Sequence, residues 1–172
     1  MGRLMEPAEL MGAALEVAEE GLAAGEQPIG AVVAFGDEIV GRAYTQERAL
    51  RRRLVHADLL AMIEADERLG RRKRDLPLRL AVNLEPCVMC LGTAMALGVN
   101  EVYFGLESPS DGGAAVAAAW RPEPPVPWFA APSVLVGGIR REESRELFRR
   151  WCATTPDSPA RRWAETLVTG PG

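Results

Sequence analysis

Three side chains that suit a transition metal stand in two short segments of this 172-residue chain. Cys87 and Cys90 form a Cys-x-x-Cys pair directly after Pro86, and His56 is the only histidine. Cysteines three residues apart at the start of a helix point to the same side and can reach one ion. If all three side chains bind one metal, the fold must bring these two segments together.

Hydrophobic periodicity predicts an α/β chain around these residues. The expected elements are a helix at 7–24, a hairpin of strands at 29–35 and 39–44, a helix at 56–69, a strand at 78–84, a helix at 86–97, a strand at 101–106, a short strand at 134–136 and a helix at 142–152. In the second helix, Leu59, Leu60 and Ile63 are expected to face inward, with Ala61 as a further candidate. His56 and Pro86 therefore each open a helix.

Length and composition favour a single globular domain in a reducing compartment. The chain is 48% hydrophobic and has a mean hydropathy of -0.04, as is typical of globular proteins. No apolar run approaches the roughly 20 residues that span a bilayer, and residues 1–9 do not resemble a signal peptide, so a cytoplasmic location and no membrane partner are expected. Three cysteines, an odd number, favour metal binding over disulfides. We expect one domain over 1–155 and a C-terminal extension over 156–172. The extension should form a short helix at 160–168, with Trp163 and Leu167 on its apolar side.

The charge pattern limits the choice of partners. The formal net charge of -4 counts against a large nucleic-acid footprint. Two basic runs, at 51–53 and 71–74, interrupt the acidic chain. Such runs are usually solvated, and the second is expected in a turn after a helix, where cations suit a helix C-terminus. The first stands just before His56, so it could meet a phosphate at the mouth of a site.

Two thiolates and one imidazole form a donor set that suits zinc. A helix N-terminus favours the thiolate, because its free N–H groups and dipole stabilise negative charge. Redox pairs and zinc knuckles also contain Cys-x-x-Cys, and a lone histidine is more often structural, but the combination with His56 is far more specific. Three protein ligands leave a fourth position for water, which is typical of a catalytic zinc, here one per chain. Such a water ionises near neutral pH.

The chain resembles the cytidine deaminase-like superfamily, on the branch of the tRNA adenosine deaminases and bacterial guanine deaminases. The resemblance rests on His56 with the Pro-Cys-x-x-Cys segment, and on the stretches at 27–32, 84–92 and 102–105. It covers roughly residues 10–152. It implies a three-layer α-β-α fold with a five-stranded mixed sheet, a homodimer and hydrolytic deamination of a small amino-heterocycle, with the backbone of Cys87 helping to position the water.

One position departs from the family pattern where the chemistry is most demanding. The family's proton-shuttling glutamate stands two residues after the histidine, and this chain has Asp58 there. Aspartate has a similar ordinary pKa but is shorter by one methylene, about 1.5 Å. Because a misplacement of about 1 Å can lower a rate roughly a hundredfold, Asp58 works from a shifted helix, works poorly, or marks changed chemistry. Alternatively, Asp58 stabilises the N-terminus of its helix. In that case Glu85 and Glu64 are conceivable substitutes as the proton-transferring carboxylate.

The substrate loop also departs from the pattern of the tRNA-type enzymes, although its spacing from Gly30 to His56 is the same. Thr45 stands where those enzymes carry an asparagine that contacts the base, and it lacks the paired donor and acceptor of an amide. Arg52 and Arg53 replace the usual Asp-Pro segment, and their guanidinium groups suit a phosphate or carboxylate. The resemblance therefore makes Thr45, Arg52 and Arg53 the candidate substrate-binding residues.

Three functions are consistent with these features. The first is zinc-dependent deamination of a free base, nucleoside or related amino-heterocycle. The second is tRNA adenosine deamination; the acidic charge and the altered loop count against it, and the basic run at 71–74 counts for it. The third is a catalytically impaired zinc-binding protein of the same fold, in which Asp58 marks lost activity.

Overall fold

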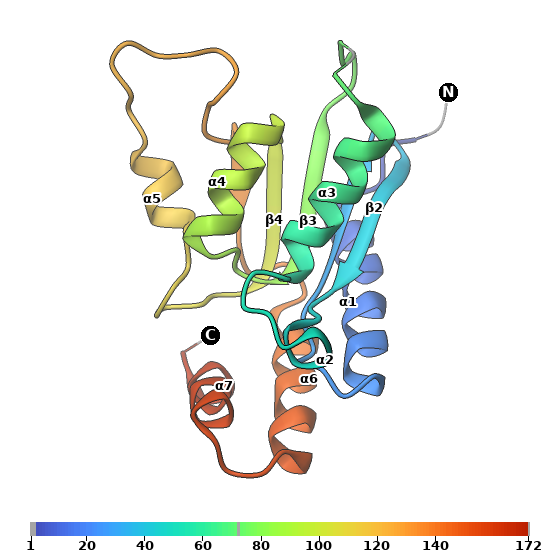
Figure 1. The fold of residues 1–172 in the computed structure, drawn as a ribbon, viewed down its shortest axis with the longest axis vertical. Helices are drawn as coiled ribbons and strands as arrows, with labels where there is room; N and C mark the ends of the chain where they lie inside the picture. The colour runs from blue at the N-terminus through green and yellow to red at the C-terminus, as the bar shows by residue number, and fades with distance from the viewer. Residues whose placement is uncertain (1–2, 72, 172) are drawn as a thin grey trace.

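The computed structural model describes residues 3–71 and 73–171, and its centre is a five-stranded mixed sheet (Figure 1). The strands are β1 (Gly30–Phe35), β2 (Glu38–Tyr44), β3 (Leu78–Leu84), β4 (Glu101–Leu106) and β5 (Val134–Val136), in the order β2-β1-β3-β4-β5. β1 runs antiparallel to β2 and β3, whereas β3, β4 and β5 are parallel. The α/β class and the five-stranded mixed sheet expected from the sequence are confirmed.

Helices cover both faces of the sheet and complete three layers (Figure 1). α1 (Pro7–Ala23) and α6 (Arg141–Thr154) pack on one face, and α3 (Ala57–Leu69) and α4 (Val88–Leu97) pack on the other. The remaining helices are α2 (Glu47–Leu50) after the hairpin, α5 (Ala114–Ala119) next to α4, and α7 (Pro159–Thr169) against α6. α2 and α5 are too short to show a hydrophobic period, so the sequence did not predict them.

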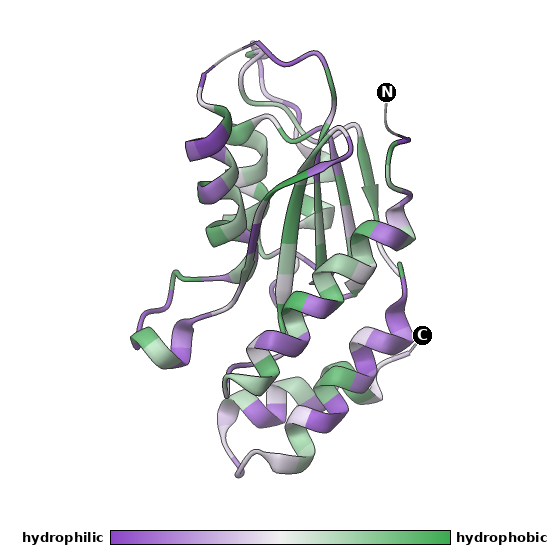
Figure 2. Ribbon diagram, turned by 90° about the vertical axis from the view of Figure 1, so that its right-hand side faces the viewer, coloured by the Kyte–Doolittle hydropathy of each residue, from purple (hydrophilic) through white to green (hydrophobic). Residues whose placement is uncertain are grey.

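Alternate residues of the central strands supply two hydrophobic cores. In β1, Ala31 and Val33 join the core under α3 and α4, whereas Val32 and Ala34 join the core under α1. This division follows from the two-residue period of a strand. Figure 2 shows the mainly hydrophobic strands enclosed by helices that alternate between hydrophobic and hydrophilic residues. None of the helices in the described ranges is both long and apolar enough to cross a membrane.

α3 lies close to the hairpin because Gly41 of β2 has no side chain. A Cβ atom at Gly41 would lie only 2.0 Å from the carbonyl oxygen of Ala61, so any larger residue would displace the helix. The prediction that Ile63 faces inward is wrong: it is 45% exposed, because α3 turns its alanine-rich side toward the sheet. Leu59 and Leu60 are partly buried.

A buried asparagine ties the start of the hairpin to β3 and α6. The Oδ1 atom of Asn83 accepts a hydrogen bond from the N–H of Gly30 (2.8 Å), and its Nδ2 donates to the carbonyl oxygen of Pro28 (2.8 Å). The same Nδ2 donates to the hydroxyl of Ser144 (3.1 Å), which donates to the carbonyl oxygen of Asn83 (2.5 Å). These bonds satisfy the buried amide and fix the end of β3, from which the chain enters the Cys-x-x-Cys segment.

α7 lies in the C-terminal segment that begins at residue 156, and it shares a hydrophobic cluster with α6. Leu167 is buried in this cluster, and the rings of Phe148 and Trp163 meet edge to face with their centroids 6.2 Å apart. Leu84 at the end of β3 belongs to the same cluster. α7 is therefore packed against the body of the domain.

Arg71, Lys73 and Arg74 of the second basic run lie in the segment directly after α3. Arg72, within the run at 71–74, lies outside the described residues. Arg74 donates a hydrogen bond to the carbonyl oxygen of Leu97 (2.6 Å), the last residue of α4. This is a favourable place for a cation, because a helix C-terminus carries partial negative charge.

Candidate metal centre and its pocket

His56 and Cys87 each stand at the N-terminal boundary of a helix. His56 is the N-cap of α3, Cys87 is the N-cap of α4, and Cys90 lies in the first turn of α4. Pro86, expected as the first helical residue, instead precedes the cap. α3 and α4 lie side by side on one face of the sheet, so their starts meet (Figure 1). Both helix dipoles therefore direct their positive ends toward the three side chains.

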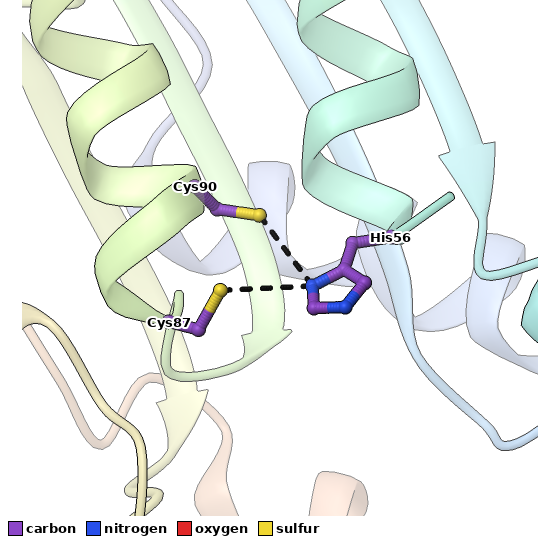
Figure 3. Close-up of side chains that lie close together, drawn as sticks. All are labelled: His56, Cys87 and Cys90. Carbon is purple, nitrogen blue, oxygen red and sulfur yellow. Dashed lines mark hydrogen bonds between the residues drawn. The ribbon is translucent and has the colours of Figure 1, made fainter. Parts of the chain in front are cut away.

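The three side chains face one another between the starts of α3 and α4 (Figure 3). The Nδ1 atom of His56 lies 3.6 Å from the Sγ of Cys87 and 3.7 Å from the Sγ of Cys90. A tetrahedral zinc ion with ordinary Zn–N and Zn–S bond lengths separates such atoms by about 3.6 Å. The donor atoms and their spacing therefore fit a zinc ion bound through this nitrogen and both sulfurs.

Hydrogen bonds among the three groups shift their protonation. The hydrogen bond with Cys90 is the largest cause that lowers the pKa of Cys87 to about 4, and His56 adds to it. The hydrogen bond with Cys87 raises the pKa of His56 to about 9, and the hydrogen bond with Cys87, together with burial, raises the pKa of Cys90. One thiolate is thus available at neutral pH, and zinc binding releases the protons that remain.

Asp58 is buried in the first turn of α3, where it lines the pocket beside the metal ligands. It is 5% exposed, and burial is the largest cause that raises the pKa of its carboxyl group, although a hydrogen bond with Cys90 opposes this. Its Oδ1 atom also accepts a hydrogen bond from the N–H of Leu59 (3.2 Å). This position is compatible with both roles considered for Asp58, proton transfer and stabilisation of the helix start.

A pocket of about 230 Å³ opens beside His56, Cys87 and Asp58. Its walls come from the segment before β1, the residues after β2, the ends of β3, the loop after β4, and α7. Pockets for drug-sized ligands measure roughly 300–1,000 Å³, so this one suits a small heterocycle.

Thr45 lines this pocket, but its hydroxyl already has protein partners. It donates to the Oε2 of Glu47 (3.1 Å) and lies 3.3 Å from the carbonyl oxygen of Val55. The Oε1 of Glu47 lies 3.8 Å from the Nε2 of His56, on the side of the imidazole that faces away from the sulfurs. Glu47 was not predicted from the sequence, because it lies in a segment that resembles a polar, arginine-rich loop. Its position two residues after Thr45 was the available signal.

Arg52 and Arg53 are exposed and do not line the pocket itself. With Arg48 and Arg51, they line an adjoining groove of about 550 Å³ between the α2 segment and the turn from α6 to α7. The pocket and the groove share Thr45 and part of their remaining lining. A substrate that filled both would therefore have its ring in the pocket and an anionic group near the arginines.

The two alternative shuttle carboxylates have structural contacts. Glu85 lines the pocket, but it accepts hydrogen bonds from the N–H groups of Ser108 (2.9 Å) and Ala114 (3.2 Å). Glu64 accepts a hydrogen bond from the backbone of β2 and is outside the pocket lining. Asp58 is therefore the carboxyl group best placed beside the metal ligands.

We predict that Cys87 is the preferred alkylation site after a chelator has stripped the protein of metal. Its lowered pKa keeps it a thiolate, and it is more exposed than Cys90 and Cys152, whose pKa values burial helps to raise. Mass spectrometry after brief iodoacetamide treatment should find a rate at Cys87 that stays constant from neutral pH down to about pH 5, and added zinc should protect it. A rate that falls below about pH 8.5, as for an ordinary thiol, would contradict this assignment.

Two bacterial relatives carry names that refer to transfer RNA. The chain is 34% identical over 164 residues to a tRNA(Ile)-lysidine synthase of Deinococcus radiodurans, a match that covers 87% of this chain and 26% of that protein. It is 35% identical over 111 residues to a tRNA-specific adenosine deaminase of Streptococcus pyogenes, covering 64% of this chain and 69% of that protein. The chain thus spans about a quarter of the first relative and about two thirds of the second.

Two solved structures have a similar fold. The first comes from a study of A-to-I editing by tRNA:A34 deaminases and has a TM-score of 0.69 and 29% identity, covering 81% of this chain and 98% of its own. The second is a guanine deaminase from Nitrosomonas europaea, with a TM-score of 0.66 and 24% identity, covering 87% of this chain and 86% of its own. The second likeness is one of fold alone.

A family match locates the metal centre within a known type of domain. Residues 5–106 match the cytidine and deoxycytidylate deaminase zinc-binding region. The match includes all three candidate ligands and ends with β4, so α5, α6 and α7 lie outside it. The chain belongs to this deaminase family, and His56, Cys87 and Cys90 form its zinc-binding triad.

Proposed function

We propose that this chain is a zinc-dependent hydrolytic deaminase of a free base, nucleoside or related amino-heterocycle. The buried carboxyl group of Asp58 carries the proposal, because it lines a ring-sized pocket beside the donor set of His56, Cys87 and Cys90. In this reaction, water replaces the amino group on the ring carbon, the carbon gains an oxygen, and ammonia leaves. The family match and the name of the relative from Streptococcus pyogenes support the same reaction type.

Each residue at the site has a distinct task. Zinc, when bound, supplies a Lewis acid that lowers the pKa of water to near neutrality. Asp58 takes a proton from the attacking water and passes it to the ring nitrogen. It then takes the proton of the hydroxyl that has been added to the ring carbon and passes it to the leaving amino group, which departs as ammonia. Its burial favours the protonated carboxyl group, which the transfers to the ring nitrogen and to the amino group need. The N–H of Cys87, at the start of α4, orients the water.

We expect Asp58→Asn to lower ammonia release at least about a hundredfold, because a positioned acid/base contributes roughly that factor or more. The amide keeps the size of the side chain but cannot carry the proton. The assay is ammonia release from a panel of amino-heterocycles, with zinc content measured for each protein. The variant Asp58→Glu tests whether the shorter aspartate side chain limits the rate. Faster ammonia release by this variant would indicate that Asp58 is too short for efficient proton transfer, and slower release would indicate that the site has been rebuilt around aspartate.

Two outcomes would count against this function. An Asp58→Asn protein with the wild-type rate would remove Asp58 from the reaction. The second outcome is that zinc-loaded wild-type protein releases no ammonia from any compound in the panel. This result would favour the alternative function, a catalytically impaired zinc-binding protein of the same fold.

A second candidate, deamination of adenosine in tRNA, is favoured by the arginine-lined groove beside the pocket. Arg52 and Arg53 could contact phosphates of an RNA whose base enters the pocket, and the names of two similar proteins point to tRNA. The acidic net charge of the chain counts against it.

For that candidate, the double variant Arg52→Ala, Arg53→Ala should flatten the salt dependence of RNA binding. Each lost phosphate contact changes the slope of log K against log salt by about 0.7 to 0.9. Filter binding of an anticodon stem-loop at several salt concentrations measures the slope, and Arg121→Ala, an exposed cation outside both basic runs, is the control. Binding that responds neither to salt nor to the double variant would eliminate the tRNA candidate.

We also propose that the protein is a cytoplasmic homodimer. Exposed apolar side chains on α3, α4 and α5, including Ile63, Val88 and Val116, are candidates for the interface. The free thiols of a zinc site favour a reducing compartment. Light scattering should give the mass of two chains, and Val116→Glu should lower it; a wild-type monomer would contradict the dimer.

A further inference from the structure

The pocket beside the metal ligands has acidic side chains and, in the described part of the chain, no basic side chain other than the histidine ligand. Its acidic residues are Glu47, Asp58, Glu85 and Asp111. Asp58 lies against Cys90, Glu85 accepts two backbone N–H groups, and Asp111 accepts a hydrogen bond from a serine hydroxyl (2.6 Å). Glu47 and Asp111 each accept a single side-chain hydrogen bond, and of these two residues Glu47 is the one that lies beside the imidazole of His56.

One oxygen of the Glu47 carboxylate accepts a hydrogen bond within the protein, and the other has no partner within hydrogen-bond distance in the described part of the chain. Its Oε2 accepts the hydrogen bond from Thr45, whereas its Oε1 lies 3.8 Å from the Nε2 of His56, beyond hydrogen-bond distance. The side chain is 39% exposed, so a ligand can reach it. An ionised carboxylate accepts hydrogen bonds and donates none, so it favours N–H groups and disfavours carbonyl or anionic edges.

A buried glutamate holds α2, and with it Glu47, in this position. Glu26 is 3% exposed and accepts hydrogen bonds from the N–H groups of Arg48 (3.1 Å) and Ala49 (2.7 Å). α2 has only four residues, too few to be stable alone, so these bonds anchor the segment. Glu47 is thus positioned before a substrate arrives, which lowers the entropic cost of binding.

Trp163 adds an aromatic wall from a distant part of the chain. It lies on α7, outside the span that matches the family, and its ring packs edge to face on Phe148. Leu167 anchors the same helix in the hydrophobic cluster with α6. The partly exposed indole lines the pocket, and an aromatic ring in a pocket wall suits stacking on a heterocyclic ring.

We infer that Glu47 and Trp163 determine specificity: they select a small amino-heterocycle with a second N–H donor over a ring that lacks it. Trp163 stacks on the ring, and Glu47 accepts the additional N–H. The inference rests on the proposed deaminase function and narrows its substrate class. A ring without the donor leaves the carboxylate unpaired, and an unpaired polar group in the site discriminates strongly.

Equilibrium binding to zinc-loaded protein tests this role separately from catalysis. The probes are two pairs that differ by one amino group: 2,6-diaminopurine with adenine, and 2,4-diaminopyrimidine with 4-aminopyrimidine. Wild-type protein should bind the diamino member of at least one pair about tenfold to a hundredfold more tightly, the ratio expected for a charge-assisted hydrogen bond. Glu47→Ala should lose this preference, and Glu47→Gln should keep part of it. Trp163→Leu should weaken both members of a pair equally.

The matched control is Glu38→Ala, at the exposed start of β2, which should keep the wild-type preference. Glu47→Ala should also keep the wild-type zinc content, which separates substrate recognition from an effect on the His56 ligand. A wild-type protein without the preference, or a Glu47→Ala protein that retains it, would overturn the inference. Failure of the deaminase function gives a different result, in which the binding preference persists but no ring releases ammonia.

Discussion

The meeting of two helix N-termini is the constraint on which the rest of the structure depends. At this point the pKa of Cys87 is lowered and the pKa of His56 is raised. The positive ends of both helix dipoles stabilise the negative charge on the sulfur of Cys87. The two helices reach this point by different routes. α4 follows directly from β3, whose end is fixed by the hydrogen bonds of Asn83, whereas α3 is placed by its close contact with Gly41. A shift of α3 would move His56 and Asp58 together, away from the sulfurs.

The metal ligands could be predicted from the sequence because each lies where one kind of periodicity changes to another. His56 stands where a polar loop gives way to an amphipathic helix, and Cys87 stands where a buried strand gives way, after Pro86, to a mainly apolar helix. Donor chemistry then restricts the metal. The failed prediction for Ile63 has a related cause, since periodicity identifies an apolar stripe but does not show which residues of the stripe contact the sheet.

The substrate side could not be predicted in the same way. Glu47 lies on a four-residue helix without its own periodicity, and its position depends on the distant Glu26. Trp163 could be assigned to the apolar side of a C-terminal helix, but only tertiary packing on Phe148 brings it to the pocket. The metal ligands lie within the family match, whereas one wall of the pocket comes from outside it. Because the metal ligands and one wall of the pocket come from different parts of the chain, the wall can differ between proteins that share the same metal centre, and the same type of reaction can act on different substrates.

The metal content of the purified protein tests the central claim most directly. Wild-type protein and Cys152→Ser, whose cysteine lies in the cluster between α6 and α7, should each contain one zinc ion per chain. Cys87→Ser should lose most of its zinc at the same chelator concentration, and its circular dichroism spectrum should show that it remains folded. A folded Cys87→Ser protein with a full complement of zinc would contradict the assignment of His56, Cys87 and Cys90 as the metal centre.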